Sequence, residues 1–574
     1  MQYITNHYFL PSWLQLYIKN LYNNISACIN TNLFCTRKVH LNRGVFQGDT
    51  LSPILFLLCV NPILKYLESE SCHGFKLRNE SINALAYADD LTLVGSNQRS
   101  SQRILNTVNS HFQKLDLQLK PSKCKSLSVV NGTTKDVKFC IDGINIENIK
   151  GSSFKFLGTT IFGVSQDSRI QDQIRDFISK NLEAINKLPL RGSYKMKLYS
   201  IFLVPKLRFQ LGVHDLSTHS LERLDVTTRK YLRKWMKIPN STNIDIFLHS
   251  RGLSIPLPSF LYDHAHIVNE TNPSDPTVSS AIVAKLNDDR RTRNEYKTCI
   301  TSQNRSLNSK NLKNATDASL KQHAETLPLQ GEWVKLLELQ NSECSFKALT
   351  LGLSEATYCW LLKASTNTLP TMAYLNKIGR TISSSCTRCG RSPETLHHIL
   401  NNCQVALDSG LYTWRHNEVL SCLFEFIQHK VRETPEWEVR ADLQCSNPGG
   451  TIPSNILLTQ LKPDLVMINS VEKEINLFEL TICWDINYQQ AKERKEERYK
   501  ELTSELTARS WKTNLLIIEV GSRGFTSNST ATNLKKIFPS KKQRASVLTK
   551  LNQTSLQASY QIFTNRQEQN WNPQ

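Results

Sequence analysis

The chain has 574 residues, 40% of them hydrophobic, which is enough for about two to four domains with cores of their own. It contains no run of about 18 apolar residues and no secretory signal pattern at its start, so we predict neither a membrane span nor secretion. The net charge of +20 predicts a polyanionic partner, and the 15 scattered cysteines favour free thiols in a reducing compartment.

The first region, residues 1–165, mixes short apolar strands with amphipathic helices. Within it, Asp89 and Asp90 stand between two apolar runs, which predicts two strands joined by a tight turn at the acids. Adjacent carboxylates at such a turn can hold Mg²⁺ (or Mn²⁺), and two such ions can serve phosphoryl transfer. Acidic pairs are also common in ordinary hairpin turns, so the neighbouring sequence has to distinguish the two interpretations.

Three further blocks surround this acidic turn: RGVFQGDTLSP at 43–53, LKPSKC at 119–124 and FKFLG at 154–158. In this order and spacing, the four blocks resemble the palm of reverse transcriptases, especially those of non-LTR retrotransposons. The resemblance implies that Gln47 and Gly48 lie near the templating base and the incoming deoxynucleotide. It also implies that Asp89 and Asp90 are metal-binding carboxylates, that Lys123 lies near the nucleotide phosphates, and that the last block is a primer grip.

The polymerase pattern lacks one expected part. Residues 1–48 contain no Asp and no Glu. A polymerase with two metal ions needs a further carboxylate on a neighbouring strand, and in this family that strand precedes the glutamine block. We therefore expect a partial palm that does not polymerise by itself, because the sequence is N-terminally truncated or an upstream polymerase fragment complements it.

Two regions follow the palm. Residues 166–265 carry apolar residues at helical spacing beside a basic face, as between Leu221 and Trp235, which predicts a helical thumb. Residues 266–330 are poor in large apolar residues and rich in polar ones, so we expect a disordered or flexible linker with at most one unstable helix.

Residues 331–405 are expected to form a helical linker that ends in a zinc knuckle. Cys386, Cys389, His398 and Cys403 have spacings suited to tetrahedral Zn²⁺, and four protein ligands indicate a structural site. The neighbouring His397 would also give workable spacings. We favour His398 because the resembling family has the same pattern over residues 394–400.

Residues 406–530 are predicted to form an α/β endonuclease. Asp464 precedes one apolar strand and Glu479 lies in the next, so a hairpin could join both acids around a divalent ion. In PD-(D/E)xK nucleases a lysine follows the second acid by two residues, where this chain has Thr481. The retrotransposon version places the lysine on the next helix, which selects Lys495.

Further residues around this predicted nuclease have less certain roles. Lys492 and Lys500 are alternatives to Lys495, because the whole charged run could also be a solvated helix face. Arg415 and His416 are expected to contact DNA, although a structural salt bridge would explain them equally well. Residues 531–574 read as a polar, loosely ordered tail.

The order of knuckle, acid pair and shifted lysine resembles the restriction-like endonucleases of site-specific non-LTR elements. The expected fold is therefore an α+β multidomain protein: a partial right-hand polymerase palm with a helical thumb, a helical linker with a CCHC knuckle, and a PD-(D/E)xK-like α/β endonuclease. The resemblance implies target-primed reverse transcription in the nucleus, with an RNA template, target DNA and deoxynucleotides as partners. The alternatives are a catalytically inactive nucleic-acid-binding remnant and a fragment that complements an upstream polymerase piece.

Overall fold

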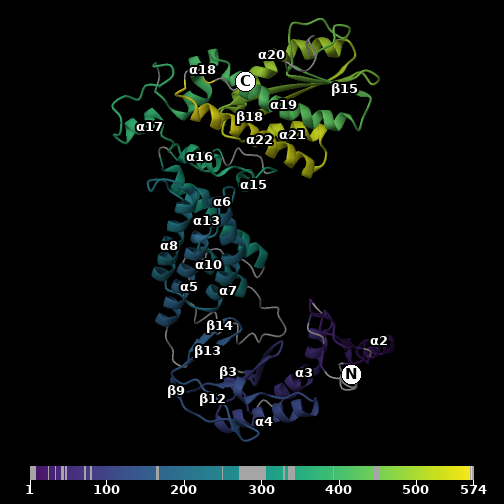
Figure 1. The fold of residues 1–574 in the computed structure, drawn as a ribbon, viewed down its shortest axis with the longest axis vertical. Helices are drawn as coiled ribbons and strands as arrows, with labels where there is room; N and C mark the ends of the chain where they lie inside the picture. Colours follow the sequence, from purple (N-terminus) through teal and green to yellow (C-terminus); the bar gives the residue numbers. More distant parts are fainter. Residues whose placement is uncertain are drawn as a thin grey trace. The chain divides into compact units, whose positions relative to one another are not determined.

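The computed structural model describes residues 8–574 except 24, 33, 41–43, 46–47, 70–72, 78–79, 163–166, 249, 271–304, 328–329, 334–335, 337–342, 392, 444–451, 569–570 and 572–574. It divides into two compact units: Met1–Ile170 with Asn272–Arg291, and Gln171–Thr271 with Thr292–Gln574. Both units contain helices and strands (Figure 1). Within the described ranges, no helix combines the length and the apolar character that crossing a membrane requires.

The first unit is organised around two helices and a hairpin. Helices α3 (Ser52–Ser69) and α4 (Gln98–Lys114) pack against the antiparallel pair β5 (Ala84–Tyr87) and β6 (Asp90–Leu93). Apolar side chains at helical spacing form the shared core: Val60, Ile63 and Leu67 from α3, and Ile104, Val108 and Phe112 from α4. This core supports the base of the hairpin and leaves its turn outside.

The other elements of the first unit are short. They are α2 (Ser12–Asn23), β1 (Ser26–Ala27), β2 (Val39–His40), β3 (Phe75–Leu77), β4 (Glu80–Ile82), η1 (Pro121–Lys123), β7 (Lys125–Ser126), β8 (Ser128–Val130), β9 (Thr133–Lys135), β10 (Cys140–Ile141), β11 (Ile144–Asn145), β12 (Glu147–Asn148), β13 (Ser153–Phe156) and β14 (Thr159–Phe162). These strands pair in twos rather than in one continuous sheet.

The second unit begins with packed helices, of which α10 contacts α7, α8 and α13 (Figure 1). The helices are α5 (Asp167–Lys187), α6 (Gly192–Leu198), the π-helix η2 (Tyr199–Leu203), α7 (Val204–Val213), α8 (Thr218–Met236), α9 (Asp245–Leu248), α10 (Pro258–Glu270), α13 (Arg305–Glu325), α15 (Phe346–Leu351), α16 (Glu355–Ser365), α17 (Met372–Lys377), the π-helix η3 (His398–Asn402), α18 (Gln404–Asp408) and α19 (Leu411–Val431).

A four-stranded mixed sheet follows, in the order β15-β16-β17-β18. Its strands are β15 (Trp437–Ala441), β16 (Leu465–Asn469), β17 (Glu474–Cys483) and β18 (Lys512–Gly521). The first three run antiparallel, and β18 lies parallel to β17 because α20 (Tyr488–Ala508) makes the crossover between them. Helices α21 (Asn528–Ile537) and α22 (Lys541–Thr564) complete the unit.

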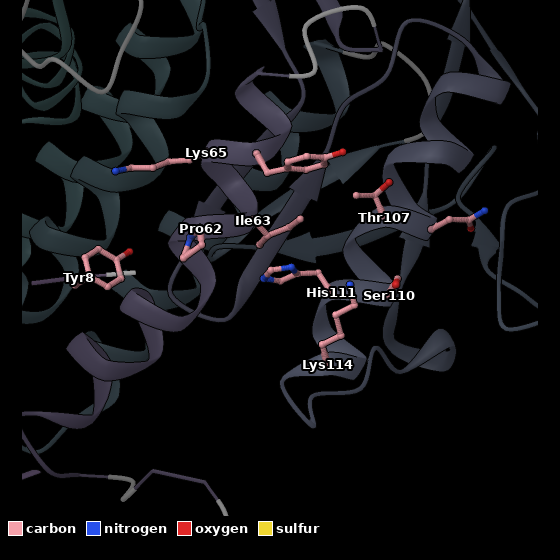
Figure 2. Close-up of a pocket in the computed structure, with 10 residues that line it drawn as sticks. Tyr8, Pro62, Ile63, Lys65, Thr107, Ser110, His111 and Lys114 are labelled. Carbon is pink, nitrogen blue, oxygen red and sulfur yellow. The ribbon is translucent and has the colours of Figure 1, made fainter. Parts of the chain in front are cut away.

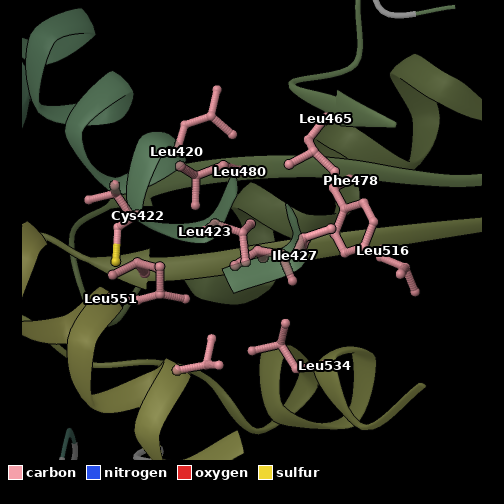
Figure 3. Close-up of a cluster of buried hydrophobic side chains, with 14 of the residues drawn as sticks. Leu420, Cys422, Leu423, Ile427, Leu465, Phe478, Leu480, Leu516, Leu534 and Leu551 are labelled. Carbon is pink, nitrogen blue, oxygen red and sulfur yellow. The ribbon is translucent and has the colours of Figure 1, made fainter. Parts of the chain in front are cut away.

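Both faces of the central part of this sheet are buried, so β16 and most of β17 and β18 are buried along their length. On one face, Phe478 and Leu480 of β17 pack with residues of α19, α21 and α22, and Figure 3 shows Leu423, Ile427 and Leu551 of those helices around them. On the other face, alternate residues of β16 and β17 pack against α20. The direction of each strand residue therefore decides which helix layer it meets.

The structure differs from the sequence-based predictions for the C-terminal residues and for the expected linker. Residues 531–574 do not form a loosely ordered tail, because α21 and α22 are helices whose apolar side chains lie in the core of the sheet. Many polar residues of α22 are small enough to be buried with them, which hid its apolar stripe in the sequence. In the expected linker at 266–330, residues 305–325 form α13, with Leu312 packed against Ile267, while residues 271–304 lie outside the described ranges.

Candidate functional sites

Three cysteines and one histidine converge at the start of η3. The ligand atoms of Cys386, Cys389, His398 and Cys403 all lie within 4.8 Å of one another, and Cys389 Sγ lies 3.3 Å from His398 Nε2. Three thiols and one imidazole are a donor set that fits tetrahedral Zn²⁺. His397 points elsewhere: its ring stacks on Trp484 at 4.9 Å between centroids. Of the two histidines that the spacing allowed, the geometry therefore selects His398.

The local backbone explains how the knuckle forms. Gly390 has φ of +70°, a left-handed conformation that glycine adopts without strain, and its N–H donates to the Cys386 carbonyl at 2.8 Å. The buried Glu394 carboxylate accepts from the backbone N–H groups of Thr387 and Met372 at 2.9 and 3.1 Å. These hydrogen bonds hold the loop between the first two cysteines independently of a bound ion.

The knuckle also binds the end of the last helix. The Arg388 guanidinium donates to the carbonyls of Asn565, Arg566 and Glu568 at 3.2–3.3 Å. These three residues directly follow α22, which ends at Thr564, so Arg388 holds the segment in which that helix terminates. The knuckle is thereby joined to a helix that packs under the sheet.

The register of the sheet brings the two predicted nuclease acids together. Leu465 pairs with Phe478, so Asp464, one residue before β16, lies beside Glu479. The Leu480 backbone N–H donates to Asp464 Oδ2 at 2.7 Å, which holds the carboxylate against β17. Glu479 alternates with Ile475 and Leu477 on the face that meets α20, and only 2% of its surface is exposed.

Lys495 reaches this pair from α20. Its ammonium forms an ion pair with Glu479 Oε1. The other sequence candidates, Lys492 and Lys500, instead pair with Glu496 and Glu497 of their own helix, at 3.6 and 3.5 Å. Helical spacing explains the difference, since Lys495 lies on the side of α20 that faces the sheet, near Tyr499.

The acid site has unused oxygen atoms. Glu479 Oε2 is buried and has no partner of ordinary hydrogen-bond geometry among the described residues; the nearby Tyr499 hydroxyl, which lowers the pKa of Glu479, donates to the Lys462 carbonyl at 3.1 Å. Burial and the charge of Asp464 raise the pKa of Glu479, and the Lys495 ammonium opposes this shift. A divalent cation would satisfy the free oxygen and remove the repulsion between the two carboxylates, so these oxygens fit Mg²⁺ or Mn²⁺.

The two residues expected to contact DNA lie in different surroundings. His416 Nε2 is 3.3 Å from Asp464 Oδ2, so its ring contacts the acid site. Arg415 is only 1% exposed and donates to Ser559 Oγ of α22 at 3.0 Å. The expectation for Arg415 was wrong: neighbouring residues on a helix face different directions, and this one faces the buried side of α19.

Asp89 and Asp90 lie at the tip of the β5–β6 hairpin. Tyr87 pairs with Asp90, so the turn residues are Ala88 and Asp89, one position earlier than predicted. Ala88 has φ of +54°, which a tight hairpin turn requires. Both carboxylates are exposed, and neither forms an ion pair with a lysine or arginine within the part of the chain that the structure describes. The tip is therefore open to cations.

The other predicted polymerase residues lie on separate elements. Gly48 has φ of +99°, and Gln47 lies outside the described residues. Lys123 ends the short helix η1 and is exposed. In the block expected to be a primer grip, Leu157 and Gly158 form the turn of the β13–β14 hairpin, with φ of +46° and +80°.

Sequence reasoning missed a buried cluster beside the sheet. Arg523 is fully buried, forms ion pairs with Asp485 at 2.8 Å and Glu332 at 3.0 Å, and lies 4.0 Å from the centroid of the Trp484 ring. Trp484 in turn stacks on His397, next to the knuckle ligand. No local signal in the sequence around Arg523 identifies its distant acidic partners.

Two segments of the chain match known protein families. Residues 1–161 match the family of reverse transcriptases (RNA-dependent DNA polymerases), and residues 351–409 match the family described as zinc-binding in reverse transcriptase. The Pol polyprotein of the type-1 retrotransposable element R2 of Nasonia vitripennis is 25% identical over 73% of this chain and 40% of its own length. That of the type-2 element R2DM of Drosophila melanogaster is 24% identical over 86% of this chain and 45% of its own length.

A third relative, the Pol polyprotein of a type-1 R2 element of Popillia japonica, is 24% identical over 82% of this chain and 73% of its own length. The chain spans less than half the length of the Nasonia and Drosophila relatives. The matched families, the gathered zinc ligands and these relatives support a non-LTR retrotransposon reverse transcriptase with a zinc knuckle.

Proposed function

We propose that the second unit is a divalent-metal-dependent endonuclease that nicks DNA, and that the nick primes reverse transcription, to which the first unit contributes part of the polymerase palm. The observation that carries the nuclease proposal is the meeting of Asp464, Glu479 and Lys495. They come from a loop, a strand and a helix, and they leave a buried carboxylate oxygen without a partner. The substrates would be target DNA, an RNA template and deoxynucleotides, and chromosomal target DNA implies a nuclear location.

Asp464 and Glu479 would hold Mg²⁺ or Mn²⁺ through the oxygens that their protein partners leave free. The ion would supply Lewis-acid stabilisation of the negative charge that develops on the phosphate. Lys495, paired with Glu479 and one quarter exposed, would orient the attacking water and offset charge on the phosphate. The Leu480 N–H keeps the Asp464 carboxylate in place throughout.

The folds support the finer assignments. A mixed sheet covered by α20 on one face and by α19, α21 and α22 on the other is compatible with a PD-(D/E)xK-like nuclease, with Glu479 on the central strand β17 and Asp464 just before the central strand β16. For the first unit, a hairpin that carries two exposed carboxylates on a two-helix core is compatible with part of a polymerase palm. The helices α5 to α10 would be the thumb.

Plasmid nicking with Mg²⁺ tests the nuclease. We expect Asp464→Asn to lower the nicking rate by about a hundredfold or more, because one ion ligand loses its charge. The matched control is Glu472→Gln, which removes an exposed carboxylate from the turn between the same two strands. Nicking that survives in Asp464→Asn would refute the assignment, and no nicking by the unaltered chain would leave a nucleic-acid-binding protein.

Primer extension on an RNA template tests the polymerase separately. The exposed Asp89 and Asp90 carry this proposal together with the family match over residues 1–161. We expect any extension by the chain to require Mg²⁺ and to be lost in Asp89→Asn. The Glu472→Gln variant again serves as the control, because it leaves the hairpin unchanged.

A further inference from the structure

A groove of about 760 Å³ runs along the first unit between α3 and α4, away from the carboxylates of the hairpin tip. Figure 2 shows Pro62, Ile63 and Lys65 on one wall and Thr107, His111 and Lys114 on the other. Of the lining residues, Ile63 belongs to the core beneath these helices, while the polar and charged ones are not part of that core. Nothing described so far assigns a function to this groove.

The lining is rich in hydrogen-bond donors and lacks acids. Lys65 and Lys114 contribute two ammonium groups, and no ion pair joins either of them to another residue of the described ranges. The Asn106 carbonyl already accepts from Gln102 at 2.8 Å, so its amide N–H groups are available. Ten residues line the groove, and none is Asp or Glu. Such a surface is complementary to an anion.

The groove also has a planar, exposed aromatic side chain. Tyr66 is 51% exposed and lines the groove together with Pro62, which forms the accessible apolar part of its floor. A groove that combines cations on different helices with an exposed aromatic ring suits a chain that alternates phosphates with flat bases. A small anion would use the ammonium groups but would leave the ring and the floor without a partner.

We propose that this groove binds a single-stranded polynucleotide, with phosphates at Lys65 and Lys114 and a base against Tyr66. The net charge of +20 favours the same class of partner over an apolar or cationic one. The proposal does not depend on nuclease activity, because all the lining residues belong to the first unit.

One structural explanation competes for Lys114. It lies in the last turn of α4, where a cation also stabilises the negative end of the helix dipole. If that were its whole contribution, replacing it would lower the melting temperature and leave nucleic-acid binding unchanged. Lys65 lies in the interior of α3, so the same explanation does not apply to it.

The first test measures the affinity of the full chain for fluorescein-labelled oligo-U and oligo-dT of about 12 nucleotides, by anisotropy across a salt series. We expect Lys65→Gln with Lys114→Gln to weaken binding about tenfold and to lower the salt slope by about 1.4, since two phosphate contacts of a single strand are lost. The matched control, Lys135→Gln with Lys150→Gln, removes two exposed lysines of the same unit outside the groove. The two oligonucleotides show whether RNA or DNA is preferred.

The second test does not require a charge change. A photo-cross-linking amino acid replaces Thr107 in the groove or, as a control, Val129, which is 59% exposed on β8. We expect oligo-U to cross-link at position 107 far more than at position 129, and unlabelled oligo-U to compete. The proposal is overturned if both positions react equally, or if the lysine double variant binds as tightly as its control.

Discussion

His416 should control how tightly the acid site binds its ion. Its Nε2 lies 3.3 Å from Asp464 Oδ2, the oxygen that also accepts the Leu480 N–H at 2.7 Å. Removing a residue that orients a metal ligand commonly costs about 10- to 100-fold in affinity. The His416 bond is long, and the Leu480 N–H remains, so we expect His416→Ala to weaken Mn²⁺ binding about tenfold, or ~1.4 kcal/mol.

Mn²⁺ titration of the full chain followed by electron paramagnetic resonance measures this directly, without DNA or turnover. His416→Gln keeps an N–H donor at about the reach of Nε2, so its affinity should stay within about threefold of the unaltered chain. His429→Ala, an exposed histidine on the same helix, is the matched control. The reasoning fails if His416→Ala binds Mn²⁺ normally, or if His429→Ala loses as much affinity.

Four further outcomes are expected. Arg523→Met should destabilise the second unit by about 3–5 kcal/mol in thermal unfolding, because it leaves Asp485 as a buried unpaired charge, and Asp485→Leu in the same chain should restore most of the loss. Leu551→Ala should cost about 2–5 kcal/mol and speed proteolysis of α22, since Leu551 lies in the sheet core. Cys403→Ser should lower the zinc content from about one ion per chain, measured by atomic absorption. Burial raises the pKa of Glu479 above 4.5, and protons compete with the ion, so Mn²⁺ affinity should fall as the pH is lowered through that raised pKa; an affinity independent of pH would contradict this.

The sequence was sufficient where a local pattern determines the geometry. The three cysteines and His398 all lie within one short segment. Side chains alternate between the two faces of β17, which directs Glu479 toward the helix that follows this strand. It was insufficient where distant segments meet. Arg415 reads as a polar helix residue, and only its contact with Ser559, 144 positions later, explains why it is buried. The sequence did not predict the helix at residues 541–564 for the same reason. That helix is stabilised by packing against distant segments rather than by its own polar residues.

The long final helix has a practical consequence for anyone who dissects this chain. Its apolar side fills the sheet core, and its end is held by Arg388 of the knuckle. An expression fragment that stops at residue 530 would lack Leu548 and Leu551, and it would expose to water the apolar side chains that pack with them, such as Leu423 and Leu516, so we expect it to precipitate. A usable nuclease fragment should therefore continue past Glu568 and start upstream of α15, so that the zinc loop is purified together with the catalytic sheet.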